Sequence, residues 1–115
     1  MADGVYHADA ATRWGRFTIA EQLAHVGSEV ERTLRAQVAG NVGRRDLALA
    51  RALELFDLTA TDPPWAGARR REILRARETF CELIFTDDTS AASIAGLRRY
   101  FLAFAVLARA KAGAA

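Results

Sequence analysis

Apolar side chains recur at spacings of three and four residues through the first third of the chain, which is the pattern of an amphipathic helix. Thr18 and Glu21 fit a capping box, in which each side chain satisfies a free backbone amide at the start of a helix. Gly40 followed by Asn41 is typical of a helix end. The sequence therefore predicts a first helix from Thr18 to Gly40, with an apolar stripe formed by Ile19, Leu23, Val26, Val30 and Leu34.

Three further helices are predicted over about residues 44–59, 68–85 and 91–110. The second is apolar around nearly its whole circumference, so we expect it to lie at the centre of the fold or to face another subunit. Asp62, Pro63 and Pro64 end this region, and Asp62 is expected to cap a new turn that has Pro63 at its first position. The expected stripes of the last two helices are Ile73, Phe80 and Ile84, and then Ile94, Leu97, Phe101, Ala105 and Ala108.

Four helices of this length joined by short connections predict an all-α fold, an antiparallel up-down-up-down four-helix bundle. The bundle domain is expected over residues 17–112, after a weakly patterned N-terminal segment of residues 1–16. Trp14 and Phe17 are expected to pack down and anchor the entry to the first helix. Gly27 and Gly96 lie within helices, where glycine is costly, and the simplest reason is a close approach of a neighbouring helix.

Composition narrows the classes of function only a little. The formal net charge is +2, from 16 basic and 14 acidic residues, and Lys111 is the only lysine. Cys81 is the only cysteine, so an intramolecular disulfide is excluded and a reducing compartment is favoured. No apolar run approaches the roughly 20 residues of a membrane span, and no signal peptide is recognised. The expectation is a soluble, cytoplasmic protein with no membrane partner.

Arg77 is the most informative single residue, because it lies between Ile73 and Phe80 near the apolar stripe of the third helix. A guanidinium at such a position needs a partner or has to extend along its stem to water. We expect the partner on another helix, either Glu29 or Asp57. Three roles stay open for Arg77: it forms a buried structural ion pair, it binds a ligand or a phosphate, or it lies at the surface.

A related hypothesis is that the bundle has a polar centre. Its candidate residues are His25, Glu29, Arg77 and Glu78. Bundle metal sites combine ligands at such helical spacings on facing helices, but their usual Glu-x-x-His motif does not occur here. The sequence therefore predicts neither a metal nor a cofactor. It also offers no catalytic residue: Cys81 is expected to be a small core residue, and no phosphate loop or nucleophile motif is found.

A cluster of arginines opens the third helix, at positions Arg69, Arg70, Arg71 and Arg75. Positive charge at a helix N-terminus opposes the helix dipole. A nucleic-acid phosphate would offset that repulsion, so these four are candidate nucleic-acid-binding residues. The alternative is a solvated charge cluster interspersed with Glu72.

Several stretches resemble a family of small bacterial helical proteins of no known activity. They are residues 18–30, residues 51–59, Arg77 and Glu78 with Cys81, and Tyr100 and Phe101 with Phe104. The resemblance implies a four-helix bundle and carries no functional residue with it.

Three hypotheses about function follow. The first is a non-enzymatic interaction module, a homo-oligomer that binds a macromolecular partner. It is based on the second helix, which is apolar around nearly its whole circumference, and on the fourth helix, which is rich in aromatic residues. The second is a nucleic-acid accessory protein that uses Arg69 to Arg75. The third is a ligand-binding or metal-binding bundle centred on His25, Glu29, Arg77 and Glu78, and it requires these side chains to converge.

Overall fold

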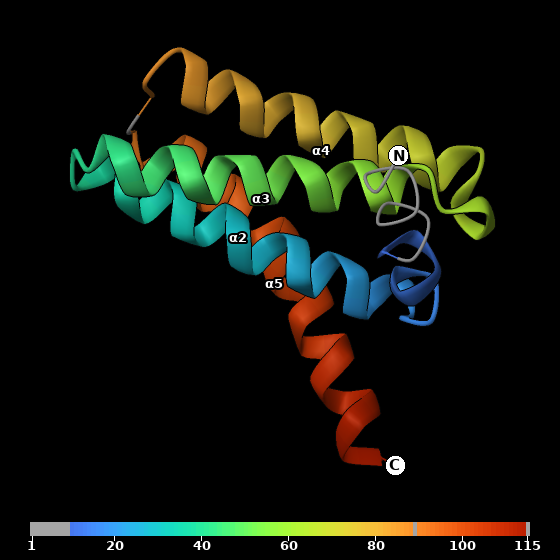
Figure 1. Cartoon of the computed structure of the whole chain (residues 1–115). Coiled ribbons are helices and arrows are strands. Elements are labelled where there is room, and N and C mark those ends of the chain that lie inside the picture. The colour runs from blue at the N-terminus through green and yellow to red at the C-terminus, as the bar shows by residue number, and fades with distance from the viewer. Residues whose placement is uncertain (1–9, 89, 115) are drawn as a thin grey trace.

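A computed structural model describes residues 10–88 and 90–114 of the chain, with side chains through residue 110. Residues 10–14 form a helical turn. Four long helices follow: α2 (Ile19–Val38), α3 (Val42–Ala60), α4 (Ala68–Phe85) and α5 (Ala91–Ala114), with a short 3-10 turn, η1 (Pro63–Trp65), between α3 and α4. Every regular element in these ranges is helical, which confirms the all-α class (Figure 1).

The predicted capping box at the start of α2 is confirmed. The hydroxyl of Thr18 accepts a hydrogen bond from the backbone amide of Glu21 at 3.2 Å, and the carboxylate of Glu21 accepts one from the amide of Thr18 at 2.9 Å. Two of the free amides at the helix start are thereby satisfied.

The turn between α2 and α3 uses one residue pair to end one helix and begin the next. Gly40 has a φ of +71°, a left-handed conformation that glycine adopts without strain. The amide of Asn41 then donates to the carbonyl of Ala36 at 2.9 Å, as in a Schellman motif. The Asn41 side chain accepts from the amide of Arg44 at 3.1 Å, so α3 begins at Val42, slightly earlier than predicted.

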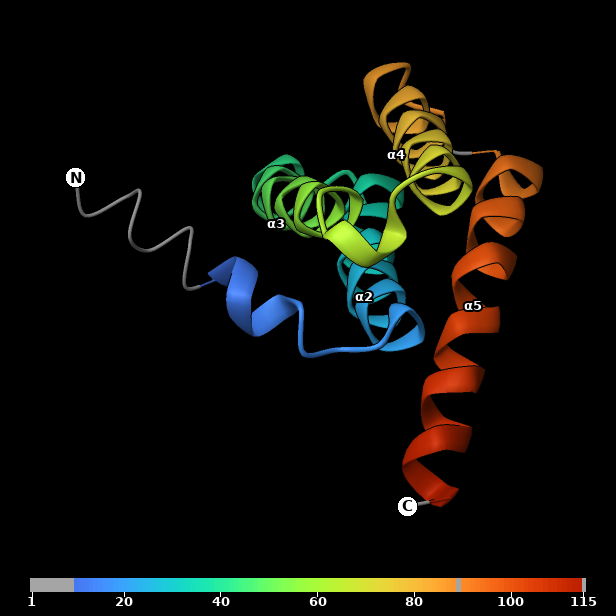
Figure 2. The same cartoon turned by 90° about the vertical axis from the view of Figure 1, so that its right-hand side faces the viewer.

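The central helix is α2, which packs against α3 on one side and α5 on the other (Figure 2). Its predicted stripe is confirmed, since four of its five members are at most 2% exposed and Ile19 is half-buried: Leu23, Val26, Val30 and Leu34 form the centre of the core. The second predicted helix is therefore not the central one, and the alternative expectation, that it faces another subunit, stays a prediction. On that helix, α3, Ala52 and Phe56 are fully buried while Leu47 is 70% exposed.

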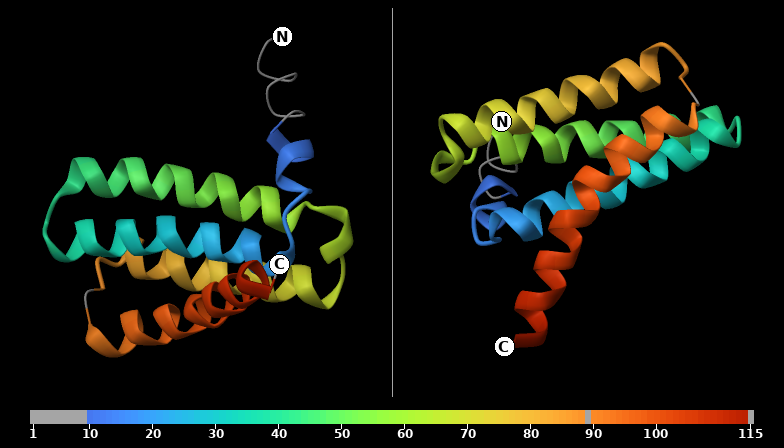
Figure 3. Two further views of the ribbon diagram at one scale, coloured as in Figure 1. Left: turned by 90° about the horizontal axis from the view of Figure 1, so that it is seen from below. Right: turned by 180° about the vertical axis from the view of Figure 1, so that it is seen from behind.

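The last two helices contribute their predicted stripes unequally. On α4, Ile73, Phe80 and Ile84 are buried as expected. On α5 the stripe is buried only as far as Phe101, and Ala105 and Ala108 further along it are half-buried. The C-terminal part of the helix runs away from the other three and projects from the body of the molecule (Figures 1 and 3), although Phe104 still packs against the core.

The two helical glycines turn out to differ. A methyl group on Gly27 would lie 2.8 Å from Cβ of Phe101, so the predicted close approach of α2 and α5 is confirmed there. Nothing lies within 4 Å of the corresponding position on Gly96, so the same prediction for α5 is wrong at that residue.

The N-terminal segment is anchored mainly by one of the two predicted aromatic residues. Trp14 is 8% exposed and belongs to the core, as expected, whereas Phe17 remains 36% exposed. Of the predicted segment 1–16, residues 1–9 lie outside the part of the chain that the structure describes.

Candidate functional site

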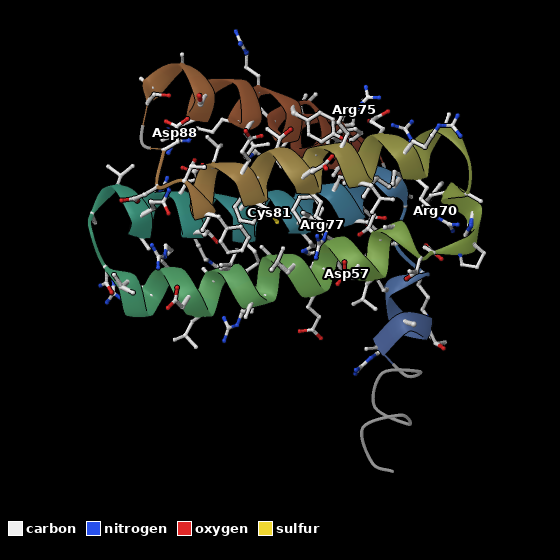
Figure 4. The ribbon with its side chains drawn as sticks, turned by 90° about the horizontal axis from the view of Figure 1, so that it is seen from above. Asp57, Arg70, Arg75, Arg77, Cys81 and Asp88 are labelled. Atoms are coloured by element: carbon white, nitrogen blue, oxygen red, sulfur yellow. The ribbon has the colours of Figure 1, made fainter. Side chains whose placement is uncertain are left out.

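Arg77 finds one of its two predicted partners. Its Nε donates to Oδ1 of Asp57 at 3.1 Å, which joins α4 to α3 (Figure 4). The side chain of Arg77 is 34% exposed and that of Asp57 is 62% exposed. Because water reaches both groups, this is a partly exposed ion pair, of a kind worth about 0.2–1 kcal/mol. The guanidinium is not enclosed in the bundle, so of the three roles left open for Arg77 the fully buried ion pair is excluded.

The other proposed members of the polar centre have different surroundings. His25 is exposed, with its ring centroid 5.1 Å from that of Phe17 and 5.7 Å from that of Trp14. Glu29 pairs with Arg32 on its own helix at 2.6 Å. Glu78 is exposed on α4. The contacts of these residues therefore do not unite them in one site, and no group of three potential metal ligands occurs among the described residues.

Cys81 is half-buried one turn after Arg77 on α4 (Figure 4). Burial raises the pKa of its thiol, and the nearby charge of Arg77 offsets this only in part. A raised pKa keeps the sulfur protonated and weakly nucleophilic at neutral pH, which fits the expected role as a small core residue.

Two arginines of the α4 cluster have partners within the fold, and the other two are exposed. Arg70 donates through Nε to the carbonyl of Ala60 at the C-terminus of α3, and Arg69 pairs with Glu72 at 3.2 Å. Arg71 and Arg75 are exposed. The guanidinium of Arg70 thus lies against the negative end of α3, where a cation interacts favourably with the helix dipole. The nucleic-acid hypothesis is left with Arg71 and Arg75 as its free charges.

The buried polar centre of this protein is Gln22, which the sequence analysis missed. Gln22 is fully buried and its Nε2 donates to Oδ2 of Asp62 at 2.7 Å and to the carbonyl of Trp14 at 3.1 Å. Its Oε1 accepts from the indole of Trp65 at 2.9 Å. The position of Gln22 beside Leu23, on the flank of the apolar stripe, was the available signal. This network joins three segments of the chain and has a structural role.

The C-terminal part of α5 carries several exposed apolar side chains. Beyond Phe101, the side chains of Leu102, Val106 and Leu107 are 58%, 55% and 57% exposed. They belong to the C-terminal part of α5, which projects from the bundle (Figure 3). We call residues 102–114 the α5 arm.

The arm continues a helix that also satisfies a membrane-span criterion. Residues Ala91–Ala110 have a mean hydropathy of 1.4, and only 17% of the scored stretch is buried. By length and composition alone this helix is able to cross a bilayer, a property that the sequence analysis did not expect. The segment nevertheless includes Arg98, which makes a two-pronged ion pair with Glu31 on α2 at 2.8 Å for both hydrogen bonds.

Two grooves flank α2. One, of about 800 Å³, runs between α2 and α5 and reaches Leu102, Ala105 and Arg109 of the arm. The other, of about 500 Å³, lies between the C-terminal half of α2 and the N-terminal half of α3 and is lined by Leu47 and four arginines. Both are surface depressions whose linings combine small and apolar side chains with several arginines.

Comparison with protein families, curated proteins and solved structures gives no match for this chain. The resemblance to small bacterial helical proteins therefore stays an expectation.

Proposed function

We propose that this protein is a non-enzymatic interaction module that self-associates through the α5 arm. The observation that carries this proposal is the exposure of Leu102, Val106 and Leu107 on the part of α5 that projects from the bundle. Apolar area removed from water contributes about 25 cal/mol per Å². A helix apolar around much of its surface gains that free energy only by packing against another surface.

A second copy of the chain supplies such a surface. The groove between α2 and α5 lies beside the arm and has small residues, Ala24 and Ser28, on its α2 side. In a twofold dimer, each copy uses the same patch, so the arm of one subunit packs into the groove of the other while its own groove receives the partner's arm. The four helices are expected to pack in an antiparallel up-down-up-down order. In this proposal the second half of α5 takes part in that packing through the partner subunit and not through its own three helices.

Sedimentation equilibrium over a range of micromolar concentrations tests the proposal. We expect a dimer or higher oligomer for the native chain and a monomer for the double variant Leu102→Glu, Val106→Glu. The matched control is Val38→Glu, Val42→Glu, which places the same charges on side chains that are 60% and 55% exposed at the α2–α3 turn. A native chain that stays monomeric, or equal loss of association in both variants, would refute the proposal.

A membrane is the alternative destination for the arm, and it makes a different prediction. If α5 inserts into a bilayer, the native chain will float with phosphatidylcholine vesicles and the arm variant will not. Flotation of this kind would replace self-association as the explanation of the exposed apolar residues.

A further inference from the structure

The groove between α2 and α3 combines an apolar floor with a cationic rim. Leu47 is 70% exposed at this site, and Ala36 and Ala48 form part of the same surface. Arg32 and Arg35 approach from α2, and Arg44 and Arg51 from α3. The groove follows the α2–α3 pair at the end nearest their connection (Figure 1).

The arginines of this groove are only partly neutralised. Four guanidinium groups face one lining carboxylate, that of Glu29, which leaves a local charge of +3. Glu29 pairs with Arg32 at 2.6 Å, and Arg35 pairs with Glu31 outside the groove at 3.1 Å. Within the described part of the chain, Arg44 and Arg51 have no ion pair. Two free cations on α3 therefore lie at the edge of an exposed leucine.

This combination discriminates between classes of anionic partner. A nucleic-acid backbone presents phosphates and sugars, which satisfy arginines but leave an apolar floor uncovered. An acidic amphipathic helix presents carboxylates beside an apolar stripe, and it fits a groove between two packed helices as a third helix does. Arginine binds carboxylates and phosphates alike through two parallel hydrogen bonds, so the apolar side chains of the groove are what favour the helical partner.

We propose that the α2–α3 groove is a binding site for an acidic amphipathic helical segment of another protein, with Leu47 contacting its apolar face and Arg44 and Arg51 pairing with its carboxylates. This site is separate from the α5 arm, so it does not depend on self-association. It gives the interaction module a defined class of partner.

Fluorescence anisotropy with designed probes tests the site. The first probe is a labelled peptide of about 14 residues, roughly 21 Å long as a helix, with leucines along one face and glutamates beside them. The second probe carries lysines in place of the glutamates, and the third is a single-stranded oligonucleotide of similar negative charge. We expect binding of the glutamate peptide only, weakened by added salt because the rim charges are exposed.

Variants assign that binding to the groove. Arg44→Glu with Arg51→Glu, and separately Leu47→Ser, are expected to raise the Kd at least about tenfold. The matched control Arg71→Glu with Arg75→Glu makes the same charge change on α4 and is expected to leave the Kd unchanged. All of these side chains are exposed, and circular dichroism checks that each variant keeps its helix content.

Three results would overturn the proposal: no binding of the glutamate peptide, binding that the groove variants leave intact, and equal weakening by the α4 control. Binding of the oligonucleotide alone, lost in the Arg44 and Arg51 variant, would reassign the groove to nucleic acid. Dimerisation is followed in the same samples by sedimentation, so failure of the peptide site and failure of self-association are seen separately.

Discussion

The indole of Trp65 donates a hydrogen bond of 2.9 Å to the side-chain amide of Gln22, across 43 positions of the sequence. Trp65 belongs to the connection between α3 and α4, whereas Gln22 is fully buried on α2. The same amide also holds Asp62 and the backbone of Trp14. One side chain thus fixes both the N-terminal segment and the α3–α4 connection to the central helix.

Replacing Gln22 by leucine is expected to destabilise the fold by about 2–4 kcal/mol, since the volume is kept but several buried partners lose their hydrogen bonds. Urea unfolding followed by circular dichroism measures the free energy. Trp65→Phe removes a single donor and is expected to cost about 1 kcal/mol. A Gln22 variant no less stable than the Trp65 variant would contradict the role given to the network.

The two helical glycines give a matched pair of opposite predictions. Gly27→Ala adds a methyl group 2.8 Å from Cβ of Phe101, and forcing α2 and α5 apart is expected to cost about 1–3 kcal/mol. Gly96→Ala meets open space and gains helix propensity, so it is expected to stabilise the protein by up to about 1 kcal/mol. Thermal unfolding of both variants is the measurement, and shifts of the same sign would count against the described α2–α5 crossing.

The ion pair between Glu31 and Arg98 predicts a pH dependence of stability. Burial raises the pKa of Glu31, but hydrogen bonds and the positive charges of Arg98 and Arg35 outweigh this and hold the pKa below its ordinary value. A lowered pKa in the folded state means that the pair stabilises the fold above the ordinary glutamate pKa. That contribution is lost as the pH falls through the folded-state value.

Glu31→Gln isolates the effect. The pair is partly exposed, so the variant is expected to lose no more than about 1 kcal/mol at neutral pH, and the difference from the native chain should shrink in acid and in high salt. Unfolding free energies of both chains are compared from neutral pH down to about pH 3, below the ordinary glutamate pKa. A difference that stays constant with pH would remove this ion pair as its cause.

The nucleic-acid hypothesis reduces to a simple test. Arg71 and Arg75 are the exposed members of the α4 cluster. If they contact phosphate, retention on immobilised nucleic acid will fall steeply with salt and will be lost in Arg71→Glu, Arg75→Glu. Retention that is unchanged in this variant would leave the cluster with only the structural role seen for Arg69 and Arg70.

Sequence periodicity was sufficient where the determining interactions are local. The α2 stripe, the capping box at Thr18 and the helix end at Gly40 all depend on residues within one or two turns of each other, and all three are confirmed. Asp57 was one of the two partners expected for Arg77, and the structure confirms it. The partial exposure of the ion pair between Arg77 and Asp57 depends on the separation of α3 and α4, which the periodicity of the sequence does not encode.

The features that escaped prediction depend on contacts between distant segments. The partners of Gln22 on η1 and its N-cap lie 40 or more positions away, and Arg70 meets Ala60 only because the end of α3 lies beside the start of α4. The apolar stripe of α5 was expected to be buried throughout, but a stripe shows which face is apolar and not what lies opposite it. His25, Glu29 and Glu78 are of residue types that form functional sites, but the fold does not bring their side chains together.

The crossing of α2 and α5 at Gly27 and Phe101 also determines how far the end of the chain extends. From Phe101 to Ala114 the helix spans roughly 20 Å, and its C-terminal part projects from the bundle. A tilt of a few degrees at the crossing therefore shifts the far end of the helix by an ångström or more. The helix turns about the contact between Gly27 and Phe101, so a single methyl group placed there would change the position and direction of the whole C-terminal part of α5.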